Sequence, residues 1–300
     1  MAEIDRPIFM LGTGRSGTTV AYQLLIRHPA LAWYSSYDLR FPDAGWAHLA
    51  KRIQDVPGLR TLAANSQRGL AARPVEPFAL MDQDFPGFGE PYRNLRASDL
   101  TPWARKRLRT RISARLKQER RPRFAMKWTG WSRAGFMDAA FPDARFIHVH
   151  RDGCAVASSL LQQPWWRGWQ GPSQWHWGPL SPEDDALWRA HDESFVVLAG
   201  IQWRLCYEEI QASLAAIPQD RVLCLAYEDL CSAPMDRMRE LFAFVDLPFT
   251  RDVEQAVAGI SLRNDAVDRW RRDLNPEQAD ALEEAIGPAL AAQRAARGGA

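Results

Sequence analysis

A short apolar run, a glycine-rich turn and a helical pattern follow one another near the start of the chain. The run spans Ile8–Leu11, and the turn Gly12–Thr19 leads into a helix expected over Thr18–Arg27 that Pro29 ends. A second apolar run, Leu31–Tyr34, comes next. Strand, turn, helix and strand in this order are typical of a βαβ unit, and this unit predicts a parallel sheet.

The rest of the chain extends this pattern. Further strands are expected over Phe124–Trp128, Arg145–Val149 and Arg221–Ala226. Helices are expected over Thr101–Arg121, Gly153–Leu161, most of Ala186–Ile217, Met235–Val245 and from Asn275 onward. We therefore expect an α/β chain with a P-loop-like three-layer fold, a mainly parallel five-stranded central sheet and helical insertions. Residues 1–300 would form a single domain, with a Trp-rich insertion at 164–182 and a disordered tail from about 292.

Charge and cysteine content argue against several classes of protein. The 38 basic and 36 acidic side chains nearly cancel, so nothing predicts a nucleic-acid partner. The four cysteines form no C-x-x-C pair, which favours a reducing, cytoplasmic location over a disulfide framework or zinc site. No signal peptide precedes the first strand, and no apolar stretch approaches the roughly 20 residues of a transmembrane helix.

The glycine-rich turn resembles a Walker A loop with one change. Its backbone N–H groups and the following helix N-terminus would bind an anion. Thr18 stands where Walker A has the lysine that contacts the β- and γ-phosphates, and the loop carries Arg15 instead. Lys127 and Arg151 end the third and fourth strands, where a magnesium-binding aspartate would be needed. These residues predict an anion site that requires no metal.

A second motif begins where the fourth strand ends. Arg151 stands at the strand end, and Ser159 lies eight residues further on, within the next helix. An arginine and a hydroxyl in these positions can hold one phosphate group from two sides. An arginine at a strand end can also be an ordinary salt-bridge partner. Its combination with the first loop favours the binding role.

The two motifs together, R-S-G-T-T and R-D-x-x-x-V-A-x-S-x, resemble those of the PAPS-dependent sulfotransferase superfamily, whose donor is 3′-phosphoadenosine 5′-phosphosulfate. The resemblance to its bacterial-type members implies sulfuryl transfer from PAPS, with PAP as the product and no metal. It also implies two groups of cofactor-binding residues. The 5′ side would be bound by Gly14, Arg15, Ser16, Gly17, Thr18 and Thr19, and the 3′-phosphate by Arg151 and Ser159.

Two later segments resemble family elements as well. Tyr227-Glu-Asp-Leu follows the fifth strand, and its tyrosine would lie near the adenine. The segment Asn264–Asp273 resembles a C-terminal loop that closes over the cofactor, with Arg269, Trp270 and Arg271 as its contacts.

The catalytic groups are expected beside the transferred sulfuryl group. The resemblance implies that Lys127 lies near the bridging oxygen, with Arg15 as a second cation, although a strand-end lysine can also be a surface residue. Small-molecule sulfotransferases carry a histidine where this chain has Thr129, whereas Golgi-type members use a carboxylate after the second strand. Asp38 and Glu90 are the candidate bases, and each could instead be a cap or a salt-bridge partner.

The acceptor is the open question. Trp165, Trp166 and Trp169, together with Trp175 and Trp177, could form a lid or an apolar wall for the hydroxyl or amine of a carbohydrate, lipid or small molecule, although core packing is the alternative. His148 and His150 alternate on the fourth strand and are expected to be packed rather than metal-bound, and His28 to be structural. Two other functions remain open, a P-loop kinase of a small metabolite and a non-catalytic nucleotide-binding protein.

Overall fold

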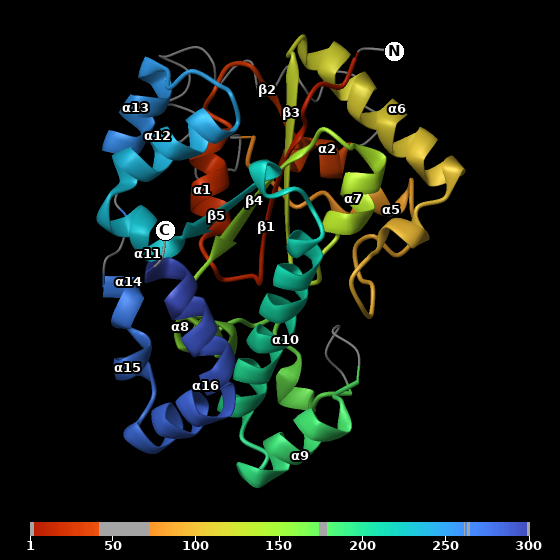
Figure 1. Ribbon diagram of the computed structural model, residues 1–300. Coiled ribbons are helices and arrows are strands. Elements are labelled where there is room, and N and C mark those ends of the chain that lie inside the picture. Colours follow the sequence, from red (N-terminus) through yellow and green to blue (C-terminus); the bar gives the residue numbers. More distant parts are fainter. Residues whose placement is uncertain (1–2, 42–71, 174–178, 261, 263–264, 299–300) are drawn as a thin grey trace.

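The computed structural model describes residues 3–41, 72–173, 179–260, 262 and 265–298, and its centre is a five-stranded parallel sheet (Figure 1). All pairings between neighbouring strands are parallel, in the order β2-β3-β1-β4-β5. The strands are β1 (Ile8–Gly12), β2 (Leu31–Ala32), β3 (Arg123–Thr129), β4 (Arg145–His150) and β5 (Val222–Ala226). The expected α/β fold with a five-stranded parallel sheet is confirmed.

Helices lie on both faces of this sheet (Figure 1). They are α1 (Thr18–Leu25), α2 (Ser36–Arg40), α5 (Phe78–Asp82), α6 (Pro102–Glu119), α7 (Ala134–Ala140), α8 (Gly153–Leu161), α9 (Pro182–Ala190), α10 (Phe195–Ala215), α11 (Tyr227–Ser232), α12 (Pro234–Phe244), α13 (Arg251–Ala258), α14 (Asp265–Asp268), α15 (Trp270–Asp273) and α16 (Pro276–Gly298). Single 3₁₀ turns occur at Ala97–Asp99, Gly168–Gln170 and Gln219–Arg221.

Strand β1 explains why the sheet is covered on both sides. All five of its residues are buried, and its side chains alternate between two hydrophobic clusters. Phe9 and Leu11 face the cluster that includes side chains of α6 and α7, whereas Ile8 and Met10 face the cluster of α1 and α12. A strand that is apolar on both faces requires helices on both faces, so the three-layer architecture follows from the sequence of β1.

A third hydrophobic cluster lies beyond the C-terminal ends of the strands. It joins α8, the first half of α10, and α16. The α10 helix is one long element rather than part of a continuous helix from Ala186, because Asp192 and Glu193 adopt left-handed backbone conformations between α9 and α10. Such residues stop an α-helix, and no Gly or Pro between Ala190 and Phe195 predicts the break.

The expectation of a disordered tail from about 292 is wrong. Helix α16 continues to Gly298. Its last turns carry Arg294, which pairs with Asp152 at 2.9 Å, and Arg297, which pairs with Asp229 at 2.6 Å. These contacts attach the end of the chain to the turn after β4 and to α11, and they stabilise the last helical turns.

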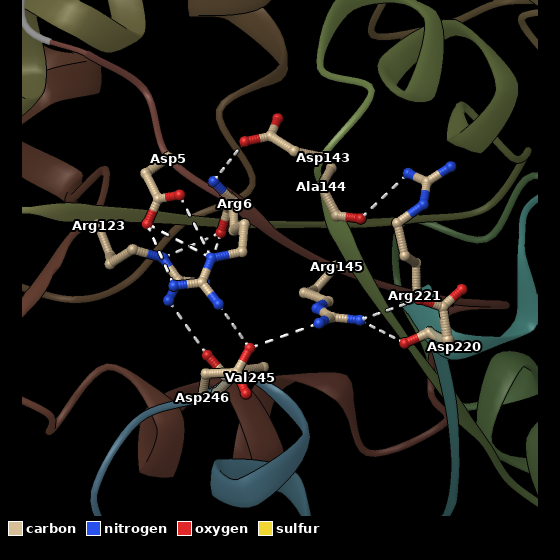
Figure 2. A network of polar contacts seen from close by, with 10 residues as sticks. All are labelled: Asp5, Arg6, Arg123, Asp143, Ala144, Arg145, Asp220, Arg221, Val245 and Asp246. Carbon is tan, nitrogen blue, oxygen red and sulfur yellow. Dashed lines mark hydrogen bonds and ion pairs between the residues drawn. The ribbon is translucent and has the colours of Figure 1, made fainter.

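A group of arginines surrounds the N-terminal ends of the strands (Figure 2). Arg123 at the start of β3 donates to the carbonyl oxygens of Arg6, from Nε at 3.0 Å, and of Val245, from Nη1 at 3.1 Å. Arg6 and Arg145 share one carboxylate oxygen of Asp246, at 2.7 and 3.4 Å. At this end of the sheet each of these three arginines donates to at least one acceptor within the fold.

Candidate active site

The turn between β1 and α1 has the backbone of an anion-binding loop. Gly14 and Gly17 have φ values of 80° and 89°, and Arg15 between them has φ 54°. A side chain at Gly17 would overlap the ring of Tyr227, so glycine is required there for conformation and for space. A non-glycine residue in the left-handed region costs free energy and is concentrated at functional sites.

The same turn contains a buried hydroxyl group without a hydrogen-bond partner. Ser16 is fully buried, and no described residue bonds to its Oγ. A side chain at Gly12 would collide with this Oγ and with the carbonyl oxygen of Val149. Buried polar groups nearly always have partners, so an orphaned hydroxyl in such a loop is available to a ligand. The residues present therefore fit the phosphosulfate end of PAPS.

The structure brings the two sequence motifs together. Arg15 Nε donates to Ser159 Oγ of α8 at 3.0 Å, and Arg151 Nη1 donates to the carbonyl oxygen of Arg15 at 3.2 Å. Burial, and then the nearby charge of Arg151, lower the pKa of Arg15. Within the described ranges, Arg15 forms no ion pair with a carboxylate. The adjacent guanidinium groups of Arg15 and Arg151 form a site for an anion.

Residues after β4 hold Arg151 in position. Asp152 caps α8 by accepting hydrogen bonds from the backbone N–H groups of Cys154 and Ala155. Its own backbone N–H donates to Glu228 Oε1 at 2.9 Å, and Gln293 of α16 donates to the carbonyl oxygen of Arg151 at 2.7 Å. The turn that carries Arg151 is thus fixed from α11 and from α16.

Tyr227 lies between the two motifs. Its ring packs against Gly17, and the guanidinium of Arg151 lies 5.2 Å from the ring centroid. Burial raises the pKa of Tyr227 to about 12, so the hydroxyl is protonated at neutral pH. The position after β5 gives this ring access to both halves of the site.

At the end of β3, Lys127 forms an ion pair that the sequence did not indicate. Its Nζ lies 2.6 Å from Oε1 of Glu76 and 3.4 Å from Thr19 Oγ1 in the phosphate-binding turn. The second carboxylate oxygen, Oε2, accepts a hydrogen bond from Thr129 Oγ1 at 3.0 Å. Lys127 is 4% exposed, so it is not a surface lysine.

Glu76 reaches this place through a short backbone pairing. Residues 73–75 run antiparallel to the segment that follows β2, with a bridge between Ser35 and Pro74. Ser36 N donates to the carbonyl oxygen of Arg73 at 2.8 Å, and Val75 N to that of Tyr34 at 3.3 Å. A carboxylate is therefore present near the end of the second strand, but a neighbouring segment supplies it.

Asp38, the first candidate base, has a different environment from the one expected. It is 2% exposed, and its Oδ2 accepts hydrogen bonds from Ser35 N at 2.6 Å and Ser35 Oγ at 2.7 Å. Its Oδ1 pairs with Arg115 of α6. Asp38 thus caps α2 and neutralises a buried arginine, because an acid three residues after a serine completes a capping box.

Glu90, the second candidate, is exposed in the loop after α5. This loop is fixed by Arg133, which is 2% exposed and donates from Nε to the carbonyl oxygen of Phe88 at 2.6 Å and from Nη2 to that of Gly89 at 2.8 Å. Burial lowers the pKa of Arg133 to about 10. Arg133 therefore acts as a structural cation under the loop.

The tryptophan-rich segment is partly buried and partly open. Trp166 is buried and donates from Nε1 to Gln202 at 2.7 Å. Trp165 and Trp169 are 55% and 50% exposed, and the ring of Trp169 packs edge-on against Trp166 and Phe195. Trp175 and Trp177 lie outside the described residues.

In the C-terminal segment, Trp270 is buried in the cluster of α8 and α16, with the guanidinium of Arg271 4.2 Å from its ring centroid. Arg269 pairs with Asp273, and Arg271 pairs with Glu283. Asn264 lies outside the described residues.

His28, His148 and His150 are structural. Burial, and then His150, lower the pKa of His148 to about 3, and burial lowers that of His150 to about 4, so both rings are neutral near pH 7. His28 Nδ1 accepts a hydrogen bond from Ala30 N at 3.1 Å. Among the described residues, no group of three or more His, Cys, Asp or Glu side chains is arranged to hold a metal ion. Across the same ranges, none of the helices combines the length and the apolarity that a membrane span needs.

Comparisons with known proteins agree with this geometry. The family model described as "Sulfotransferase family" matches residues 7–251. A search of curated proteins finds no significant match. Among solved structures, sulfotransferase STF9 from Mycobacterium avium is 19% identical, with a TM-score of 0.58 over 97% of this chain and 77% of that chain. Sulfotransferase STF1 from Mycobacterium tuberculosis is 17% identical, with a TM-score of 0.54 over 95% and 77%. At these identities the solved structures support the fold.

The matched range covers most of the chain and includes the phosphate-binding turn, Lys127, Arg151 and Ser159. The chain belongs to the sulfotransferase family. It is a PAPS-dependent sulfotransferase, which sets aside the metabolite kinase and the non-catalytic nucleotide-binding protein.

Proposed function

We propose that this enzyme transfers the sulfuryl group of PAPS to a hydroxyl, or an amine, of a carbohydrate, lipid or small-molecule acceptor, with Glu76 as the general base. One observation carries the proposal. The Lys127–Glu76 ion pair, at 2.6 Å, lies at the end of β3 and next to Thr19 of the phosphate-binding turn. A cation and a base side by side are what an in-line displacement at sulfur requires.

The donor would lie across the C-terminal ends of β1 and β4. In this proposal the 5′-phosphosulfate binds the backbone N–H groups of Gly14–Thr19, with the orphaned Ser16 hydroxyl as an added contact. The 3′-phosphate binds Arg151 and Ser159, and Arg15 exchanges its bond to Ser159 for one to the nucleotide. The adenine lies near Tyr227, and Arg269, Trp270 and Arg271 of the C-terminal segment contact the nucleotide from outside.

The reaction follows from these positions. The acceptor oxygen attacks sulfur and gives its proton to Glu76 as the new S–O bond forms. The bond from sulfur to the 5′-phosphate oxygen breaks, and PAP leaves with the negative charge that Lys127 and Arg15 neutralise. We favour Glu76 over Asp38 because the Asp38 side chain is 2% exposed and paired with Arg115, whereas that of Glu76 is 23% exposed and contacts Lys127. The direct contact with Lys127 also favours Glu76 over Glu90.

The acceptor would approach past the exposed rings of Trp165 and Trp169. Exposed indole rings beside a polar centre suit the faces of sugar rings and apolar acceptors alike. All four cysteines are unpaired thiols. Free thiols are typical of proteins in a reducing compartment, and we propose that the enzyme is cytoplasmic.

Glu76→Gln tests the proposal most directly. The change keeps the shape of the side chain and an oxygen that can accept from Thr129, and it removes the base together with the negative charge that pairs with Lys127. We expect kcat to fall about 10²- to 10⁴-fold. PAP affinity, measured by calorimetry, should stay within about twofold, since PAP carries no acceptor. Turnover would be followed as PAP release from PAPS over a panel of sugar, phenol and lipid alcohols.

Glu90→Gln serves as the matched control and should keep its turnover. If Glu76→Gln stays active while Glu90→Gln is dead, the base is Glu90 and the assignment is wrong. Asp38→Asn should lower the melting temperature through loss of the pair with Arg115 without a specific loss of turnover in the folded enzyme.

A further inference from the structure

A second cavity lies apart from the catalytic centre. Its volume is about 550 Å³, and it opens between the end of β2, helix α5 and helix α6 (the elements appear in Figure 1). None of its lining residues belongs to the phosphate-binding turn, the end of β3 or α8. Small-molecule sites have volumes of about 300–1,000 Å³, so its size suits a small ligand.

The wall of this cavity is basic and aromatic. Four basic side chains of α6 and two carboxylates line it. Both carboxylates are already paired within the fold, Asp38 with Arg115 and Asp84 with Arg107 and Arg111. Lys106, the remaining cation of the wall, forms no ion pair in the described part of the chain. The charge that is left over is therefore positive, and it favours an anion.

Aromatic rings provide a second kind of contact. Trp103 at the start of α6 is 55% exposed, and the guanidinium of Arg107 lies 5.1 Å from its ring centroid. On the inner wall, Arg115 lies in the same way over the ring of Tyr34, at 5.0 Å. Stacked rings and guanidinium groups bind flat, conjugated ligands well.

Two buried polar atoms on the inner wall lack partners. Tyr34 is 2% exposed and Arg115 is 9% exposed, and neither the hydroxyl of Tyr34 nor Nε of Arg115 has a hydrogen-bond partner among the described residues. Burial raises the pKa of Tyr34, so its hydroxyl keeps its proton at neutral pH. Both atoms can therefore donate, and what is missing is an acceptor.

We propose that the cavity between α5 and α6 is a binding site for a small aromatic anion, such as an aryl carboxylate or aryl sulfate. The anionic group would accept hydrogen bonds from Tyr34 and Arg115 and face Lys106, and the ring would stack beside Trp103. The proposal does not depend on the assignment of Glu76, because none of the lining residues contacts the reacting groups.

The test uses 2-naphthoate as the probe and 2-naphthamide as its neutral counterpart. Binding to the full chain is measured by calorimetry with saturating PAP. We expect naphthoate to bind at least tenfold more tightly than naphthamide. Tyr34→Phe should weaken naphthoate binding about three- to tenfold, the cost of one hydrogen bond, and Lys106→Gln about two- to fivefold.

Two controls separate this cavity from the acceptor site. Lys117→Gln lies on α6 outside the cavity wall, and Trp169→Ala removes an exposed ring that also lies outside this wall and is proposed to line the acceptor's approach. Both should bind naphthoate as the wild type does. Loss of binding in Trp169→Ala with full binding in Tyr34→Phe and Lys106→Gln would overturn the proposal, as would no binding to the wild type at millimolar concentrations.

Stability gives an independent readout. Since the Tyr34 hydroxyl has no internal partner, Tyr34→Phe should melt at or above the wild-type temperature. A clear drop in melting temperature would mean that the hydroxyl is bonded within the ligand-free protein, and it would overturn the role given to it here.

Discussion

At the N-terminal ends of the strands, Arg6, Arg123 and Arg145 donate to carboxylates and carbonyl oxygens of the fold (Figure 2). At the C-terminal ends, Arg15 and Arg151 lie next to each other, and among the described residues the guanidinium of Arg15 donates only to the hydroxyl of Ser159. The two regions use the same side chain at opposite edges of one sheet.

The difference separates structural from binding arginines. An arginine whose donors are all met inside the protein has already completed its contacts, and its loss leaves acceptors unsatisfied. An arginine held beside another cation is destabilised until an anion arrives, and its loss costs the folded chain little. Substitutions at the N-terminal edge should therefore lower stability, and substitutions at the C-terminal edge should lower PAP binding or turnover.

The largest effect is expected at the C-terminal edge. Lys127→Ala removes the cation proposed to neutralise the leaving oxygen, and loss of one such group lowers kcat about 10²- to 10³-fold. PAP binding should fall much less than turnover, because the charge that Lys127 is proposed to neutralise develops on the leaving oxygen in the transition state. Turnover of Lys127→Ala would be compared with that of Lys117→Ala, an exposed lysine on α6. Wild-type turnover in the Lys127 variant would remove this residue from the mechanism.

The second effect is expected at the N-terminal edge. Arg123 is 5% exposed, and Arg123→Met would leave the carbonyl oxygens of Arg6 and Val245 without donors. At about 1–3 kcal/mol for each unsatisfied buried group, the free energy of unfolding should fall by roughly 2–6 kcal/mol. Urea denaturation would measure the loss. The folded variant should bind PAP normally, and a large loss of affinity with intact stability would contradict the division between the two edges.

Much of the fold was predictable because its core elements are locally encoded. All five strands were expected within a few residues of their observed bounds, since parallel strands buried on both faces appear as continuous apolar runs. In the helix expected over Thr101–Arg121, Leu108, Ile112 and Leu116 recur every four residues, and they belong to the buried face of α6. The short helices α2 and α5 were missed, because each spans a single turn and depends on tertiary contacts.

The carboxylate that we propose as the base could not be predicted from the sequence, for a different reason. Glu76 and Lys127 are 51 positions apart, and they meet only because residues 73–75 pair with the segment after β2. The prolines at 74 and 77 on either side of Glu76 were the one local signal, since they favour a rigid, extended backbone. Asp38 was a candidate because it is the first carboxylate after the second strand, but a serine three positions before an acid also predicts a capping box.

The third effect returns to the C-terminal edge. Arg15→Gln should weaken PAP binding about 10- to 100-fold, which corresponds to the roughly 1.5–3 kcal/mol of a charge-assisted hydrogen bond. The free energy of unfolding should stay constant or rise, because the like charge beside Arg151 disappears. Calorimetry and urea denaturation on the same preparation give both numbers. A variant that loses stability but binds PAP as before would place Arg15 with the structural arginines.

The smallest effect concerns the exposed part of the N-terminal group. Asp246 accepts from both Arg6 and Arg145, but its side chain and that of Arg6 are 46% and 40% exposed, so water screens the pairs. Asp246→Asn keeps a hydrogen-bonding oxygen and should lower the free energy of unfolding by less than about 1 kcal/mol, with a difference that shrinks further in high salt. Paired denaturation curves at low and high salt would measure it. If the loss instead matched that of Arg123→Met and ignored salt, the network in Figure 2 would act as one buried unit, and its exposed members would have to be counted with the structural core.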